Sequence, residues 1–450
     1  MVTAKPRLDH SKDYLAAFEL LHNNDRSSPE WLRQLRNEAL DEFTVVGLPT
    51  NRRGNEGWKY TDVRPISRAP FLPTSEVVSY RDQRSLLTTD DHQVSACLLN
   101  GKFSNNQTDL GALPEGVIIG SLAEAVKSQE NLVRTHIGKY ADWKGEPFTA
   151  FNTAFFEDGI FIYVPDGVCV PGWVNIQLLS QSSSMESSHP RVLVILGVGA
   201  KLNLVEDYRG VGDEERLVNG VVEFVLMAQS QLESYRVQRQ AEGVFHIVTT
   251  AVQLEAGASF SSLTMDLGGA LARNKLTVKL HGEFAQSHLR GLYVVSGGQH
   301  TDNQIVVDHA SPKTTSRQIF RGILDDRAKA VFHGSVIVRK GADGSDATQE
   351  DRNLLLSPST EVNAKPALWI YADDVKCSHG AASGQLAEES LFYLRSRGLS
   401  EREARHMIIE AFLGEVLGTG SNGGLQKGFQ GLVSNKIKQL PSTNFSEGTQ

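Results

Sequence analysis

The feature that most constrains the fold is a long run of short apolar segments between about residue 148 and residue 383. The segments alternate apolar and polar residues, as β-strands do, and Gly, Asp and Asn turns separate them with almost no helical pattern in between. Similar phrases recur, for example GAKLNL from Gly199 and GASFSS from Gly257. Such repetition predicts stacked coils, that is, a β-helix. A large β-sandwich is the structural alternative, and the repetition favours the β-helix.

The sequence on either side of this run is helical in pattern. Ser121 with Glu124, and Ser400 with Glu403, have the spacing of a capping box, which marks the start of a helix. We therefore divide the chain into an N-terminal helical and mixed region (1–147), a β-helix core (148–383) and a C-terminal helical region (384–450). The tail from Gly418 is rich in Gly, Ser, Asn and Thr, which predicts a loosely held segment.

Composition excludes several classes of function. The formal net charge is −8, so bulk electrostatics do not favour binding to nucleic acid or to an anionic membrane. No apolar run approaches the roughly 18 residues that span a bilayer. The N-terminus lacks the pattern of a signal or transit peptide, and we expect a cytoplasmic protein.

The three cysteines, Cys97, Cys169 and Cys377, are far apart and form no CxxC motif. This pattern argues against a disulfide scaffold and against a self-contained zinc or iron–sulfur site, which needs about four ligands. Any metal chemistry would need ligands from another chain. Cys97 and Cys169 have apolar neighbours, and we expect both to be buried structural residues.

Cys377 and His379 stand out in the stretch DDVKCSHGAASGQL. In an extended strand, side chains two residues apart point the same way, so the thiol and the imidazole would share one face. Both are suitable ligands for iron or zinc. The alternative is a last strand whose Cys and His only pack under the helical cap. A nucleophilic Cys/His pair is less favoured, because the sequence identifies no third orienting group.

Other enzyme signatures are missing from the sequence. It has no GxxxxGK[ST] phosphate-binding loop, no HExxH and no GxSxG. A cytoplasmic β-helix enzyme acting on carbohydrate is the alternative function. However, the neighbouring residues Asp373 and Asp374 would face opposite sides of a strand, which is a poor arrangement for a pair of acting carboxylates.

Several motifs resemble one family closely. DDVKCSHGAASGQL, followed by LFYLRSRGLSEREARHMIIEAF, is similar to the C-terminal signature of SufD, a subunit family of the SUF iron–sulfur cluster assembly machinery. WKYTDVRPI near the N-terminus and GLYVVSGGQHTDNQIVVDHA in the core are also similar to that family. The paralogous SufB family has a motif like CxHEA, whereas Gly380 follows the histidine here.

The resemblance implies a mainly β fold, with a right-handed parallel β-helix core between N-terminal and C-terminal helical regions. It implies a non-enzymatic scaffold subunit that pairs edge to edge with a SufB-like subunit, with a homodimer possible when the chain is alone. The family's interface ligands fall on Cys377 and His379. They would handle a transient iron ion or iron–sulfur cluster that is not stably bound.

The resemblance also implies a SufC-like ABC-type ATPase that docks on the C-terminal helices and hydrolyses ATP in place of this chain. The apolar side chains there exceed what two short helices can bury against each other. We expect one part to pack on the end of the β-helix and another part to form the docking face, from the set Leu391, Phe392, Met407, Ile408 and Phe412.

Overall fold

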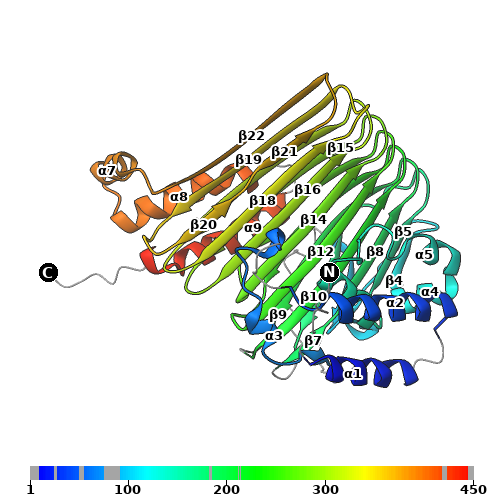
Figure 1. The fold of residues 1–450 in the computed structure, drawn as a ribbon. Helices are drawn as coiled ribbons and strands as arrows, with labels where there is room; N and C mark the ends of the chain where they lie inside the picture. Colours follow the sequence, from blue (N-terminus) through cyan, green and yellow to red (C-terminus); the bar gives the residue numbers. More distant parts are fainter. Residues whose placement is uncertain are drawn as a thin grey trace, which may run out of the picture.

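The computed structural model describes residues 10–24, 28–49, 55–74, 92–181, 185–210, 212, 214–417 and 423–443. Two long sheets, one of 12 strands and one of 10, face each other, and the chain passes from one to the other in successive coils. The fold is therefore a parallel β-solenoid of the kind that the repeated segments predict, and not a β-sandwich. Helices lie outside the solenoid at both ends of the sequence (Figure 1).

The core path of the 12-stranded sheet runs in the order β20-β18-β16-β14-β12-β10-β8-β5-β4. All its core pairings are parallel except β4 with β5. Its strands are β1 (Leu72–Pro73), β4 (Ile118–Ser121), β5 (Ile160–Val164), β7 (Glu186–Ser188), β8 (Arg191–Leu196), β10 (Arg216–Leu226), β12 (Val244–Leu254), β14 (Leu271–Leu280), β16 (His300–His309), β18 (Lys329–Val338), β20 (Glu361–Ala364) and β21 (Ala367–Ile370).

The 10-stranded sheet runs in the order β22-β19-β17-β15-β13-β11-β9-β6-β2-β3. Only β2 with β3 is antiparallel. Its strands are β2 (His92–Leu99), β3 (Lys102–Phe103), β6 (Trp173–Ser180), β9 (Lys201–Gly210), β11 (Gln231–Arg239), β13 (Ser259–Asp266), β15 (Gln286–Val295), β17 (Thr315–Leu324), β19 (Ser345–Leu355) and β22 (Val375–Gly384). Because β2 and β4 come before residue 148, strands of the solenoid begin earlier than the boundary drawn from the sequence, which falls inside the helix Pro147–Phe155.

The repeated phrases mark a turn that recurs in each coil. Gly199, Gln229 and Gly257 have positive φ angles, a conformation that glycine adopts at little cost. Their N–H groups each donate to a carbonyl one coil further on, at Ala228, Ala256 and Glu283. Alanines that follow such glycines, Ala200 and Ala258, are fully buried between the sheets. The turn thus stacks coil on coil while the alternating strands fill the interior with apolar side chains.

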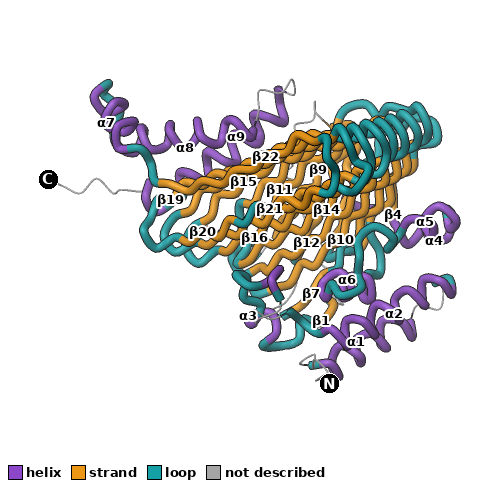
Figure 2. Tube along the Cα trace, turned by 45° about the horizontal axis from the view of Figure 1, so that its top comes forward, coloured by secondary structure: helices purple, strands orange, loops and turns teal. Residues whose placement is uncertain are grey.

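The N-terminal helices cover the outer face of the 12-stranded sheet at its N-terminal end (Figures 1 and 2). They are α1 (Ser11–Asn24), α2 (Glu30–Val46), α3 (Arg64–Ser67), α4 (Leu122–Ser128), α5 (Glu130–His136) and α6 (Pro147–Phe155), with short 3-10 turns at Glu56–Trp58 and Asn105–Gln107. Ser121 accepts a hydrogen bond from the N–H of Glu124, which confirms that this spacing caps a helix. No described helix is long and apolar enough to cross a bilayer.

Three C-terminal helices follow the solenoid, and the last two of them pack along the outer face of the 10-stranded sheet, beside β22 and β15 (Figure 2). They are α7 (Glu388–Ser396), α8 (Glu401–Leu417) and α9 (Gly423–Lys438), with a 3-10 turn at Pro441–Thr443. Helices α8 and α9 bury a joint cluster with residues of six strands, whereas α7 has no buried residue. The cluster contains Trp173, Val205, Val237, Leu263, Met265, Leu292, Val294, Ile323, Ile409, Leu413, Val416, Leu425, Phe429, Val433, Ile437 and Leu440. The expectation that these helices pack on the end of the β-helix is therefore wrong.

The prediction of a loose tail from Gly418 is also wrong for its described part. α9 spans 16 of those residues, because Leu425, Phe429, Val433 and Ile437 recur every four residues and all lie at 2% exposure or less. Residues 418–422 and 444–450 lie outside the described residues. At the start of α8, Ser400 and Glu403 bond each other's backbone N–H groups, so the second capping box is confirmed.

Candidate functional site at the open edge of the solenoid

The last strand, β22, forms one edge of the 10-stranded sheet. It pairs in parallel with β19, which places Cys377 opposite Ala347 and His379 opposite Gln349. Since Cys377 and His379 are two residues apart in one continuous strand, they lie on the same face. The other edge of β22 pairs with no described strand, so its backbone groups are open to a partner.

The two candidate ligands differ in their surroundings. Cys377 is partly buried and packs on a small apolar cluster of Val336, Val338, Ala342 and Ala347. Burial raises the pKa of the Cys377 thiol, and the Asp346 carboxylate raises it further. The thiol is therefore protonated at neutral pH and must lose a proton before it binds a metal. His379 is exposed, and a neutral imidazole can bind iron without that step.

A polar floor lies beneath His379, and sequence reasoning missed it. Gln349 is 1% exposed, as is Gln318, its partner on β17. Neither side-chain amide has a hydrogen-bond partner among the described residues. Buried amides normally find partners, so this column favours a polar ligand or water at the end of the solenoid. The sequence held one signal for this column: residues 318, 349 and 379 are spaced by about one coil, so they lie side by side on neighbouring strands.

The described part of one chain offers few metal donors at this edge. The described residues contain no group of three or more His, Cys, Asp or Glu side chains able to hold a metal ion. Cys377 and His379 supply two donors, whereas iron–sulfur clusters and structural metals take about four. Two donors are therefore fewer than such a site needs.

The open end of the solenoid is also apolar. Leu368, Ala372 and Val375 are only partly buried against the cluster beneath Cys377. Beside them, Trp369 and Tyr371 are 53% and 59% exposed. Exposed apolar surface next to an unpaired strand edge is typical of a surface that another protein covers.

The predicted docking residues on the C-terminal helices differ in exposure. Phe392 and Met407 are 76% and 47% exposed, whereas Phe412 packs against the joint helix–sheet cluster. Leu391 and Ile408 are of intermediate exposure. The buried stripe of α8 runs instead through Ala404, Ile409, Leu413 and Val416. Met407 lies beside this buried stripe, so its side chain is left exposed to solvent.

The two other cysteines lie away from this edge. Cys97 is buried, and burial raises its thiol pKa to about 12, so it is a structural residue as expected. The expectation of burial is wrong for Cys169, which is exposed. It lies in a loop before β6 where its neighbour Val170 takes the buried position, because alternate residues of an extended segment face opposite sides.

Comparison with known proteins gives matches along almost the entire chain. Residues 178–412 match the family model described as "SUF system FeS cluster assembly, SufBD core domain", and residues 8–176 match "SufBD protein N-terminal region". The protein ABCI7, chloroplastic, of Arabidopsis thaliana is 31% identical over 86% of this chain and 82% of its own length. The SufBD family protein slr0076 of Synechocystis is 29% identical over 85% and 86%. The iron–sulfur cluster assembly protein SufD of Escherichia coli is 26% identical over 84% and 87%.

Proposed function

Since the chain belongs to the SufBD family of iron–sulfur cluster assembly proteins, we propose that it is a SufD-like scaffold subunit without catalytic activity of its own. In this proposal it pairs with a SufB-like subunit through the open edge of β22, in the cytoplasm. The observation that carries the proposal is the position of Cys377 and His379 on that edge strand. Two metal ligands at a strand edge can complete a metal site only when a second chain supplies the remaining ligands.

In the proposed complex, the nascent cluster or its iron is cargo handled between the two chains. His379 offers an exposed imidazole, and Cys377 offers a thiol that becomes a ligand once its proton is lost. The partner's edge strand continues the parallel or antiparallel ladder beyond β22 and covers Trp369 and Tyr371. When the partner is missing, a second copy of this chain can cover the same edge, which gives a homodimer.

The ATPase of the proposed complex docks on the exposed side of α7 and α8. Phe392 and Met407 supply apolar contacts there, because the opposite side of α8 is used by the solenoid. Nucleotide hydrolysis belongs to that ATPase, since this chain has no phosphate-binding loop.

The test of this proposal is to co-purify His379→Ala with the partner subunit and the ATPase, and to measure cluster formation by its visible absorbance. The complex should assemble normally while cluster yield falls at least several-fold, and Cys377→Ser should have a smaller or similar effect. Ser378→Ala is the matched control, because Ser378 lies on the same strand and faces the other side. Normal cluster yield from His379→Ala, or an equal loss from Ser378→Ala, would show that the site is wrongly assigned.

The carbohydrate enzyme is not favoured by these observations. The family match extends across the N-terminal region and the core, and the relatives from Synechocystis and Escherichia coli are named for iron–sulfur cluster assembly. Failure of the native chain to co-purify a SufB-like subunit, together with hydrolysis of a polysaccharide, would reverse this preference.

A further inference from the structure

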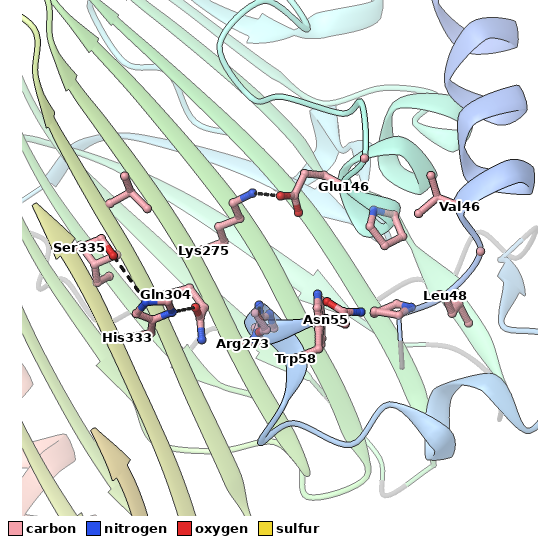
Figure 3. A pocket seen from close by; sticks show the side chains of 17 residues that line it. Val46, Leu48, Asn55, Trp58, Glu146, Arg273, Lys275, Gln304, His333 and Ser335 are labelled. Atoms are coloured by element: carbon pink, nitrogen blue, oxygen red, sulfur yellow. Dashed lines mark hydrogen bonds and ion pairs between the residues drawn. The ribbon is translucent and has the colours of Figure 1, made fainter. Parts of the chain in front are cut away.

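A large cleft lies between the N-terminal region and the outer face of the solenoid, on the opposite sheet from the C-terminal helices. Its volume is about 780 Å³, within the range of small-molecule and cofactor sites. Three successive strands form its floor, with Lys275 on β14, Gln304 on β16 and His333 on β18 (Figure 3). The segment after α2 and the turn that contains Trp58 form its walls.

The two ends of the cleft differ in chemistry. Val46 and Leu48 make one end apolar, and Gln304, His333 and Ser335 make the other end polar, as Figure 3 shows. A molecule that fills the cleft therefore needs an apolar part and a hydrogen-bonding part.

The hydrogen bonds of the polar end fix what His333 can offer. Asp302 is fully buried, and its carboxylate accepts from the Nε2 of Gln304 at 2.7 Å. The Oε1 of Gln304 is then the atom that faces the Nδ1 of His333, at 3.0 Å, so this nitrogen carries the proton. Burial lowers the pKa of His333, and the neutral ring keeps an unprotonated Nε2. The only partner of this acceptor among the described residues is the hydroxyl of Ser335, at 3.5 Å. Because so long a hydrogen bond is weak, a ligand N–H or O–H can replace the hydroxyl.

The positive charges of the cleft are not equivalent. Arg273 is already neutralised, because it pairs with Asp302, donates to the carbonyl of Gly57 at 2.8 Å and lies 3.6 Å above the ring of Trp58. Lys275 is different, since its partner Glu146 comes from the segment before α6 and the two side chains are 26% and 36% exposed. A part-exposed pair of this kind contributes only about 0–1 kcal/mol. An incoming anion can therefore replace Glu146 at little cost.

From this arrangement we infer that the cleft binds a small organic anion that has an apolar body and a hydrogen-bond donor. Its anionic group lies on Lys275, its donor on the Nε2 of His333 and its apolar body against Val46 and Leu48. The site is independent of the edge that carries Cys377 and His379, because it lies on the outer face of the other sheet, beneath the N-terminal region. Trp58, the first residue of the WKYTD motif, thereby gains a role in one wall of a binding site.

The test uses two fluorescent probes of the same shape. 8-Anilinonaphthalene-1-sulfonate has one sulfonate, two apolar ring systems and one N–H, and N-phenyl-1-naphthylamine has the same rings and N–H without the charge. Fluorescence titration of the full-length chain should give saturable binding, with the sulfonate probe bound about tenfold more tightly than the neutral probe, equivalent to about 1.4 kcal/mol. Lys275→Met should reduce that ratio to about one while leaving the neutral probe unaffected.

Two further variants separate this cleft from other apolar surfaces. Glu146→Gln should tighten binding of the sulfonate probe about threefold, because the competing carboxylate is gone. Lys279→Met is the matched control, since Lys279 is an exposed lysine on the same strand outside the cleft. In this variant the ratio of the affinities for the sulfonate and neutral probes should equal that of the unmodified chain. Absence of saturable binding, or a ratio that Lys275→Met and Glu146→Gln do not alter, or an equal change with Lys279→Met, would overturn the inference.

Discussion

Arg321 links helix α8 to the solenoid through two ion pairs. We predict that replacing this arginine lowers the stability of α8 less than replacing its two acidic partners does. Its guanidinium is fully buried and donates at 2.6 Å to both Glu350 on β19 and Glu415 on α8. The two carboxylates are 31% and 55% exposed. In Arg321→Met the stem volume is kept and the two released carboxylates are hydrated by water. We expect this variant to lose only about 1–2 kcal/mol of stability at α8.

Removing the acids should cost more than removing the base. The double variant Glu350→Gln/Glu415→Gln removes both carboxylates that are hydrogen-bonded to the buried guanidinium. Breaking a buried ion pair by removing one side of it costs about 3–5 kcal/mol. Hydrogen–deuterium exchange of the amides of α8 measures both variants as a change in the free energy of local opening. Glu415→Gln alone is the control and should lose less than about 1 kcal/mol, because Glu350 remains. A larger loss in Arg321→Met than in the double variant would refute the reasoning from exposure.

Four further outcomes follow from the same structure. Phe392→Asp with Met407→Asp should abolish co-purification of the ATPase while the circular dichroism spectrum stays unchanged, because both side chains are exposed. The chain alone should show no ATP binding at micromolar concentration by calorimetry, since it has no phosphate-binding loop. Ala387→Asp should raise the stability of α7 by about 1 kcal/mol in hydrogen exchange, because Ala387 is an N-cap with no side-chain hydrogen bond. Burial raises the pKa of Asp351 to about 7, so the folded state holds this proton more tightly than the unfolded state does. The contribution of Asp351 to the free energy of unfolding is therefore greatest below about pH 4, and it is lost as the pH rises to about 7. In urea denaturation, Asp351→Asn should abolish this loss of stability, which amounts to at most about 4 kcal/mol.

The solenoid could be predicted from the sequence because its signals are local. Alternation within each strand and a glycine turn in each coil, such as Gly199 and Gly257, leave few other folds. The same applies to the shared face of Cys377 and His379, which needs only an extended backbone. The prediction that Cys169 is buried was wrong, because apolar neighbours do not show which of two adjacent residues, Cys169 or Val170, faces the interior.

The C-terminal helices were harder to predict because long-range packing decides them. In α8, two apolar stripes lie side by side, and only the sheet beneath selects Ile409 and Leu413 over Met407. Helix α9 was not predicted, because its glycine-rich first turn is typical of a loop and drew attention away from the four-residue spacing of Leu425 and Phe429. The cleft at Lys275 could not be predicted at all, because its walls and floor come from segments that are more than 100 residues apart in the sequence.

The sheet order also determines how this chain can be built and taken apart. Each coil pairs only with the coils before and after it, so coils can be added one by one as the ribosome releases them. The helices α8 and α9 are synthesised last, yet they contact strands as early as β6. They therefore pack last, across coils that are already folded, and hold these coils together. A force applied to the C-terminus should first detach these helices and then unravel the coils singly, each releasing about 100 Å of chain for its roughly 29 residues.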